Sequence, residues 1–289
     1  MLGAAWIAGI AVLPAIAASN NGRLVVIGSR DPQRAQRLVD RYPGAHAAGS
    51  YDAVLADPHV DAVYIPLVNR DHKEWTLRAL AAGKHVLCEK PLGLNAGEVE
   101  EMAAAAERAG KHLMEAFMYR FHPRTRRFVE AVVDPLYVQA TFGFLQKGES
   151  DYRLQAQLGG GARLDVGCYV VGISRWILGE PEQVFARSSP AGGVDMTTSA
   201  LLQFAGGRTA AVWASFESPE AQNLTVVSRD GVHRLEQPFT SREEADSYQL
   251  MVESFADSVL RDRPVAIPLS ESIANMKVLD RIREAASSS

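Results

Sequence analysis

The stretch HVLCEKPL, residues 85–92, decides how the first half of this chain is interpreted. Its first four residues form a short apolar run typical of a buried strand, and Glu89 and Lys90 follow at once. In an open parallel sheet, loops at the carboxyl ends of the strands line the ligand crevice. An ammonium group held there can orient a hydroxyl and lower the pKa of a neighbouring acid, and Glu89 would help to keep it charged. Lys90 is therefore a candidate catalytic residue, with a solvated lysine as the alternative.

The same pattern, a short apolar run followed by an amphipathic stretch, recurs on both sides of this segment. It predicts strands at residues 24–28, 61–67, 85–88 and 112–115. It predicts helices at residues 32–42, 71–82 and 95–110, with Gly83 ending the second of them. Strands that alternate with helices indicate a parallel, doubly wound sheet of the dinucleotide-binding kind.

After Pro135 the pattern changes to strands joined by turns. Strands are predicted at residues 138–144, 183–188, 197–204, 209–216 and 224–227. Few helices intervene, so an antiparallel sheet is expected, with helices at residues 166–178, 245–260 and 270–286 covering one face. The chain is thus predicted to be an α/β protein with domains at residues 1–122 and 123–289.

Composition narrows the class of protein. A net charge of -4 offers no electrostatic attraction for nucleic acid or an anionic membrane surface. Two cysteines, Cys88 and Cys168, make neither a disulfide framework nor a metal cluster, which favours a cytoplasmic protein without a metal. Residues 2–18 carry no charge and end in small residues, so an exported protein with a signal peptide is the alternative.

Two segments of the first half have features of a dinucleotide site. Gly3, Ala5 and Ala8 occupy the glycine positions of a pyrophosphate-binding turn, although two of the three are alanine. Serine and arginine at the end of the next strand suit a 2′-phosphate, which favours NADP over NAD, and Asp31 suits a turn or helix cap. The expected cofactor contacts here are Gly3, Ala4, Ala5, Trp6, Ile7, Ser29, Arg30 and Arg34.

Further candidates lie in two other loops. Asn69 and His72 follow a predicted strand, so they are placed to line the crevice, although His72 alone is more often a residue at a helix start. In the second half, a run of three glycines precedes an apolar helix with Asp165 and Tyr169, which α-helical spacing puts on one face. Asp165 can hold a substrate hydroxyl or a lysine. Tyr169 can carry a proton if a cation lowers its pKa.

Together these motifs resemble the glucose-fructose oxidoreductase, inositol dehydrogenase and rhizopine catabolism (Gfo/Idh/MocA) family. HVLCEKPL and GGGARLDVGCY are similar to its two motifs, while EAFMYRFHP and YRLQAQLGGG resemble its NADP-dependent D-xylose and dimeric dihydrodiol dehydrogenases. The resemblance implies a Rossmann domain and a C-terminal domain with an open-faced antiparallel sheet that forms a homodimer. It also implies catalysis by Lys90 and Tyr169 with Asp165 as a substrate ligand. Further cofactor contacts are expected at Pro66, Leu67, Asn69, His72, Glu89, Lys90 and Glu115.

The implied activity is hydride transfer between nicotinamide and a carbinol carbon of a sugar, polyol or dihydrodiol. Two segments depart from the family pattern: Met1-Leu2 is all that is present of a first strand, and residues 228–246 are short for the strands expected there. Because that first strand would be central in the sheet, its shortness is expected to expose apolar edges and loosen the pyrophosphate turn. A catalytically impaired member that binds a dinucleotide or regulates a partner is therefore the alternative to an active enzyme.

Overall fold

The computed structural model describes residues 1–148 and 150–287, and the chain forms two compact units. Unit 1 comprises residues 1–93, 97–121 and 246–272, and unit 2 comprises residues 94–96, 122–245 and 273–289. The units are described separately below. No helix in the described part of the chain is both long enough and apolar enough to cross a membrane.

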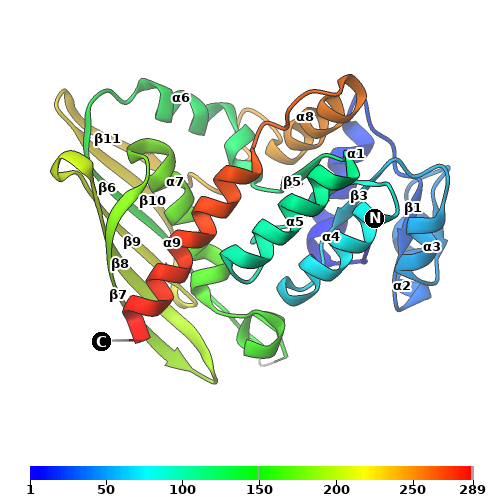
Figure 1. Ribbon diagram of the computed structural model, residues 1–289, viewed down its shortest axis with the longest axis horizontal. Helices are drawn as coiled ribbons and strands as arrows, with labels where there is room; N and C mark the ends of the chain where they lie inside the picture. The colour runs from blue at the N-terminus through cyan, green and yellow to red at the C-terminus, as the bar shows by residue number, and fades with distance from the viewer. Residues whose placement is uncertain (149, 288–289) are drawn as a thin grey trace. The chain divides into compact units, whose positions relative to one another are not determined.

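Unit 1 is built around a parallel three-stranded sheet in the order β3-β4-β5 (Figure 1). Its strands are β3 (Ala62–Ile65), β4 (His85–Cys88) and β5 (Leu113–Glu115), and all but Ala62 and His85 are fully buried. Its helices are α1 (Leu13–Ala18), α2 (Pro32–Val39), α3 (Tyr51–Ala56), α4 (His72–Ala81), α5 (Ala96–Ala109) and α8 (Ser247–Arg261). The predicted strand–helix alternation is confirmed.

A second, two-stranded parallel sheet in unit 1 pairs β1 (Val26–Gly28) with β2 (His46–Ala48). Met1 and Leu2 link it to the larger sheet: the amide of Gly28 donates to the carbonyl of Met1 at 2.9 Å, and the amide of Leu2 donates to the carbonyl of Tyr64 at 2.9 Å. The two residues therefore occupy one end of a central strand position.

Some elements of unit 1 were not predicted. Strand β2 has no fully buried residue, and helix α3 has only six residues, so neither leaves a clear apolar pattern in the sequence. The apolar helix after Gly3 also differs from an ordinary α-helix, because a π-helical segment, η1 (Ala8–Val12), precedes α1.

Unit 2 contains a six-stranded sheet in the order β11-β10-β6-β9-β8-β7. The strands are β6 (Pro135–Leu145), β7 (Pro181–Ala191), β8 (Val194–Phe204), β9 (Thr209–Ser215), β10 (Glu217–Ser228) and β11 (Gly231–Glu236). All neighbours are antiparallel except β6 and β9, which are parallel, so the predicted mainly antiparallel sheet is confirmed. Strand β11 was not predicted, because its residues alternate between apolar and charged only over a short span.

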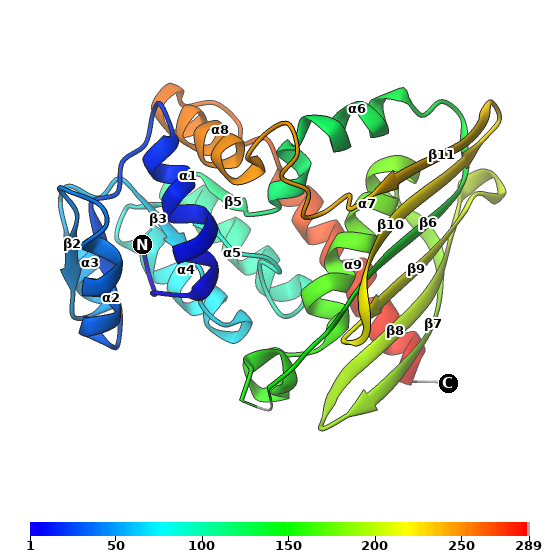
Figure 2. The ribbon, with the colours of Figure 1, turned by 180° about the vertical axis from the view of Figure 1, so that it is seen from behind.

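One face of this sheet is covered and the other is open. Helix α7 (Cys168–Leu178) and the C-terminal helix α9 (Leu269–Ser287) run along the same face (Figure 2). Ala140, Ala200 and Val212 face these helices and are buried, whereas their neighbours Phe185 and Leu201 point the other way and are 52% and 40% exposed. The remaining helix expected over the sheet, at residues 245–260, forms α8 and belongs to unit 1 instead, where it contacts α1.

Candidate active site

Lys90 lies in a turn that follows the carboxyl end of β4. The amide of Glu89 donates to the carbonyl of Ile65 at 3.0 Å, which extends the pairing with β3 by one residue before the chain turns. Lys90 is half-buried, Pro91 is buried, and the peptide bond between them is cis. The predicted placement of Lys90 just beyond a buried strand is therefore observed.

A tyrosine from the neighbouring strand holds the carboxylate of this turn. The hydroxyl of Tyr64, on β3, donates to Oε1 of Glu89 at 2.5 Å, and the amide of Lys90 donates to Oε2 of the same carboxylate at 3.3 Å. Burial, followed by the charge of Glu89, raises the pKa of Tyr64 well above its ordinary value, so this hydroxyl stays a donor. Each oxygen of the Glu89 carboxylate thereby accepts a hydrogen bond.

His72 ties the same turn to the loop after β3. Its Nδ1 lies 2.8 Å from the carbonyl oxygen of Pro91, and its Nε2 lies 3.0 Å from that of Leu67. The ring is fully buried, and burial lowers its pKa, so the neutral imidazole donates to one of these two carbonyls. The sequence suggested a cofactor contact for His72, and the structure gives it a bridging position between two loops.

Glu115 supports the turn from the end of β5. Its Oε1 accepts a hydrogen bond from the amide of Leu92 at 2.9 Å, and the side chain is 1% exposed. Burial raises the pKa of Glu115 to about 7, because an isolated carboxylate is costly away from water. Three buried side chains thus support the turn: His72 and Glu115 hold the backbone of Pro91 and Leu92, and Tyr64 holds the carboxylate of Glu89.

The turn expected to bind pyrophosphate begins at Gly3. Gly3 has φ 110°, and a side chain at this position would approach Leu67 to 2.8 Å, so glycine is required here. Its amide donates to the carbonyl of Gly28 at 2.8 Å, which places the turn beside Ser29. Ala4 is buried, Ala5 and Ile7 are half-buried, and Trp6 is 70% exposed, so its indole leaves the turn open.

The residues expected to meet the ribose lie after β1. Ser29 is 6% exposed, and its hydroxyl accepts a hydrogen bond from the amide of Asp31 at 3.1 Å. Asp31 caps helix α2 by accepting from the amides of Gln33 and Arg34, which confirms its predicted role. Both Arg30 and Arg34 are exposed.

In the loop after β3, Pro66 is buried, Leu67 is half-buried and Asn69 is 2% exposed. The contacts of Gly3 with Leu67 and Gly28 bring three of the predicted segments together at the carboxyl ends of the strands. This is the edge at which open parallel sheets bind their ligands.

In unit 2, Asp165 forms an ion pair that the sequence did not reveal. Arg153 Nε donates to Oδ2 of Asp165 at 2.8 Å, and Arg153 also lies 3.4 Å from Asp151. Burial acts to lower the pKa of Arg153, but the interactions with Asp165, Tyr152 and Asp151 together outweigh it and raise the pKa. The Asp165 carboxylate, 4% exposed, therefore sits beside a permanent cation.

The segment that carries Asp165 is not an ordinary α-helix. Residues Arg163–Gly167 form a π-helix, and α7 begins only at Cys168. The expectation that Asp165 and Tyr169 share one α-helical face is thus wrong in its geometry, because π-helical winding changes the angular spacing of side chains. Single π-turns are frequent at functional sites.

Tyr169 begins a cluster of aromatic rings. Its ring centroid lies 5.4 Å from those of both Phe142 and Phe239, which stack on each other at 5.2 Å. Tyr169 is 6% exposed, so its ring orientation is fixed by packing.

The glycine run before Asp165 allows a close approach to the carboxylate of Asp195. Gly161 has φ 113°, and a side chain there would collide with the carboxylate of Asp195. That carboxylate accepts from the amide of Arg163 at 2.6 Å and from the hydroxyl of Thr198 at 3.0 Å. Asp195 was also not predicted. Its sequence neighbours carry no motif, so only the three-dimensional contact identifies it.

The comparisons with known proteins agree with this architecture. Residues 1–117 match the model of the oxidoreductase family with an NAD-binding Rossmann fold, and residues 130–234 match the Gfo/Idh/MocA C-terminal domain. The chain belongs to the Gfo/Idh/MocA family of oxidoreductases. The predicted resemblance is therefore confirmed, and the protein is an enzyme of the oxidoreductase class.

Several characterised proteins are similar over most of the chain. D-xylose 1-dehydrogenase (NADP(+)) 2 of Haloferax volcanii is 39% identical, with 99% of this chain and 96% of the relative covered. Trans-1,2-dihydrobenzene-1,2-diol dehydrogenase of Xenopus tropicalis is 32% identical, covering 78% of this chain and 70% of the relative. The 3-ketoreductase KijD10 of Actinomadura kijaniata, solved with NADP and TDP-benzene, is 29% identical with a TM-score of 0.87, covering 98% of this chain and 96% of that one.

Proposed function

We propose that this family member is an NADP-dependent dehydrogenase that moves a hydride between the nicotinamide and a carbinol carbon of an aldose or a related cyclic diol. The observation that carries the proposal is the Lys90 turn, in which Tyr64 holds the Glu89 carboxylate and His72 and Glu115 hold the backbone after Lys90. A half-buried ammonium supported in this way is a preorganised charge rather than a solvated surface group. The similarity to D-xylose and dihydrodiol dehydrogenases supports the substrate class.

We assign the catalytic roles to Lys90, Tyr169 and Asp165. Tyr169 passes the proton of the substrate hydroxyl, and Lys90 stabilises the anionic oxygen that this transfer produces. Asp165, with its charge balanced by Arg153, orients a substrate hydroxyl by accepting its hydrogen bond. NADP supplies the hydride acceptor when it is bound.

The cofactor site proposed for residues 1–122 uses the carboxyl edge of the parallel strands. Ala4 to Ile7 present backbone amides to the pyrophosphate at a helix start, and Gly3, whose own amide donates to Gly28, holds the left-handed turn that this approach requires. The exposed arginines Arg30 and Arg34, with Ser29, suit a 2′-phosphate, and NAD is the second choice. The remaining proposed contacts are Pro66, Leu67, Asn69, His72, Glu89, Lys90 and Glu115.

The cofactor assignment is tested by titration with NADPH and NADH while the intrinsic tryptophan fluorescence is recorded. NADPH should quench more strongly at equal concentration. Arg30→Glu should weaken NADPH binding by about tenfold, the value of one charge-assisted contact, and leave NADH binding unchanged. Arg37→Glu, at an exposed position of helix α2 after Arg30, is the matched control. Equal, weak responses to both nucleotides would remove the 2′-phosphate assignment.

The substrate class is tested with a panel of D-xylose, other aldoses, inositols and a trans-dihydrodiol, each assayed with NADP and with NAD. Turnover of an aldose is the expected result. Cofactor binding without turnover of any compound would instead support the impaired, dinucleotide-binding alternative.

We also propose that unit 2, within residues 123–289, forms a homodimer through the open face of its sheet and that the enzyme works in the cytoplasm. Phe185, Leu201 and Trp213 lie on this face, and exposed apolar side chains of this kind are typical of an interface. Leu201→Asp should convert the dimer to monomer in analytical ultracentrifugation. Val133→Asp, a change at another exposed apolar residue, should leave the dimer intact.

A further inference from the structure

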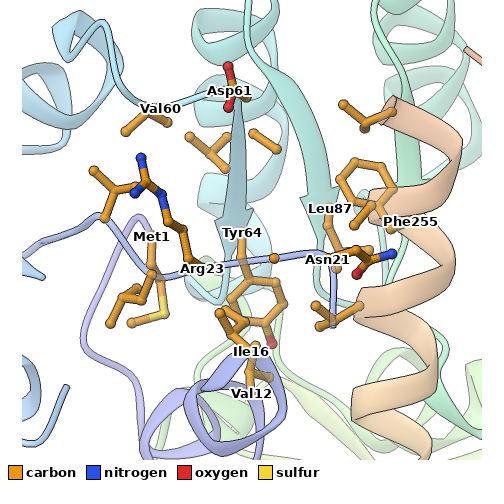
Figure 3. A pocket seen from close by; sticks show the side chains of 18 of the residues that line it. Met1, Val12, Ile16, Asn21, Arg23, Val60, Asp61, Tyr64, Leu87 and Phe255 are labelled. Atoms are coloured by element: carbon orange, nitrogen blue, oxygen red, sulfur yellow. The ribbon is translucent and has the colours of Figure 1, made fainter. Parts of the chain in front are cut away.

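A cavity of unit 1 and a polar network of unit 2 differ in what they can orient. The cavity has a volume of about 470 Å³, and most of its lining is apolar, including Met1, Val12, Ile16 and Phe255 (Figure 3). An apolar lining gives a polar substrate no direction, because hydroxyl groups are oriented by hydrogen bonds. In unit 2, by contrast, the buried carboxylate of Asp195 lies in a network of hydrogen bonds that leads to Asp165.

Asp195 lies on β8, and the direction of its side chain departs from the regular alternation of a strand. Successive side chains point to opposite faces of a sheet, so residues three apart should face opposite ways. Asp195 and Thr198 are three apart, yet the hydroxyl of Thr198 donates to Oδ2 of Asp195 at 3.0 Å. Both side chains therefore lie on the face of Ala200, which helices α7 and α9 cover (Figure 2).

A β-bulge in β8 explains this direction. Ser189 of β7 pairs with Thr197 of β8. The next residue of β7, Pro190, pairs with Asp195, so Met196 is an extra residue in β8. One extra residue reverses the face to which the residues beyond it point, and bulges re-aim side chains in this way next to active sites. Asp195 is thereby turned from the open face to the helix-covered face.

The redirected carboxylate holds the start of the Asp165 segment. Its Oδ2 accepts from the amide of Arg163, the first residue of the π-helix, at 2.6 Å. Ala162, which precedes this helix, has no side chain that can accept the bond, so Asp195 supplies the cap from another strand. Its Oδ1 packs against Gly161, where a Cβ atom would lie only 2.3 Å away. The carboxylate thus fixes two positions of the glycine-rich turn.

Gly161 connects Asp195 to the ion pair of Asp165 with Arg153. The amide of Gly161 donates to the carbonyl of Arg153 at 2.9 Å, and its carbonyl accepts from the amide of Asp165 at 3.1 Å. Arg153 Nε in turn donates to Oδ2 of Asp165 at 2.8 Å. These three residues form a closed ring of hydrogen bonds. A shift of Gly161 therefore displaces both members of the ion pair.

We propose that Asp195 is a positioning residue for the substrate: acting through Gly161, it fixes the location of the Asp165 carboxylate and thereby sets the affinity for the substrate hydroxyl. This role rests on the substrate contact proposed for Asp165, and it extends the site to a strand outside the glycine motif. The path runs through backbone groups, so Asp195 itself need not touch the substrate. Its carboxylate accepts both an amide and a hydroxyl, which holds it in one orientation.

The kinetic test uses the full chain with NADP and the substrate found in the panel. Asp195→Ala removes both acceptors, so the KM for the substrate should rise about tenfold while kcat changes by less than about threefold. Asp195→Asn retains a side-chain oxygen for the amide of Arg163 and should restore most of the affinity. Asp230→Ala is the matched control and should leave KM unchanged, because this carboxylate also accepts from a hydroxyl, that of Ser228, in another turn of the same sheet.

A milder variant serves if Asp195→Ala does not fold. Thr198→Val removes the hydroxyl that donates to Asp195 and keeps the shape of the side chain, so the KM for the substrate should rise about threefold at an unchanged kcat. An effect on stability alone would lower kcat, since less enzyme is folded, and would leave KM unchanged. A fall in kcat at constant KM in the folded variants would therefore overturn the proposal.

Amide hydrogen exchange measures the positioning without turnover. The amide of Asp165 donates to Gly161, so its exchange should become about fivefold faster or more in Asp195→Ala. The amide of Leu202, in the middle of β8, reports on folding and should not change. An unchanged rate at Asp165, or an equal acceleration at Leu202, would contradict the positioning by Asp195.

The two measurements also separate this role from the proposed function. Faster exchange at Asp165 with an unchanged KM would show that Asp195 holds the segment without affecting the substrate, which overturns the proposal and removes Asp165 from substrate binding. Absence of turnover in the parent protein would instead be a failure of the proposed function. The exchange rate of Asp165 would then decide alone whether Asp195 positions it.

Discussion

The Lys90 turn of unit 1 and the Asp165 segment of unit 2 are both held rigidly, but by different chemistry. The turn is supported by the buried side chains of Tyr64, His72 and Glu115, and burial raises the pKa of Glu115 to about 7. The Asp165 segment is supported by Arg153, whose charge is permanent, and by glycines that allow backbone and carboxylate to come close. The comparison teaches that the stability of the Lys90 turn should depend on pH, whereas the stability of the Asp165 segment should depend on its counter-charge.

The largest effect is expected from the substitution of Lys90. Lys90→Met should lower kcat by about 10³-fold, since it removes the cation that stabilises the developing oxyanion, and should leave NADPH affinity largely intact. Steady-state kinetics and a fluorescence titration measure the two quantities. Lys111→Met is the matched control, because Lys111 precedes a strand of the same sheet at its opposite end. A fully active Lys90→Met variant would exclude Lys90 from the mechanism.

The charge-balanced segment is tested by Arg153→Leu. The change leaves the buried Asp165 carboxylate without this counter-charge, and the free energy of unfolding should fall by about 3 kcal/mol. Chemical denaturation measures the loss. The double variant Arg153→Leu/Asp165→Leu should recover most of the stability, because no charge is then buried, but not the activity. Equal stability of the single variant and the parent would show that Arg153 does not balance Asp165.

The pH-sensitive turn is tested at Glu115. The unfolded chain ionises this group near pH 4.5, whereas burial in the folded chain raises the pKa to about 7. Between these values the native state binds more protons, so the free energy of unfolding should fall by up to about 3 kcal/mol as the pH rises through this window. Glu115→Gln should flatten this part of the stability profile. A profile with the same slope in both proteins would contradict the assignment.

The smallest effect is expected at Tyr64. Tyr64→Phe removes one hydrogen bond to Glu89, with a cost of about 1 kcal/mol, and should lower kcat several-fold without changing KM for the cofactor. Tyr42→Phe, after α2, provides a matched control in the same unit. If kcat is unchanged in Tyr64→Phe, the turn is held without this bond.

The sequence predicted most of the elements whose apolar pattern is long or strongly punctuated. The strand at residues 85–88 was predicted at its observed bounds, and so was the position of Lys90 in the turn that follows it. Strand β2 was missed because its residues are not buried, and helix α8 was assigned to the wrong sheet because its apolar face does not specify which surface it covers. Which surface a helix covers and where a short strand pairs depend on the fold as a whole.

The supporting residues of the site were harder to predict than the candidates themselves. Arg153 and Tyr64 act through partners that lie 12 and 25 positions away in the chain, so no local spacing reveals them. Asp165 was found from its motif, but the π-helical turn that carries it was not, since periodicity assumes α-helical winding.

The sheet of unit 2 ends at β7 and β11, and these outer edges decide how copies of the molecule can meet. Strand β7 begins with Pro181 and carries Pro190 near its end, and proline cannot donate to a further strand. The other edge carries Arg234 and Glu236, which keep it hydrated. Such edges favour the face-to-face association that we propose, which closes after two copies, over edge-to-edge pairing, which would propagate into fibres.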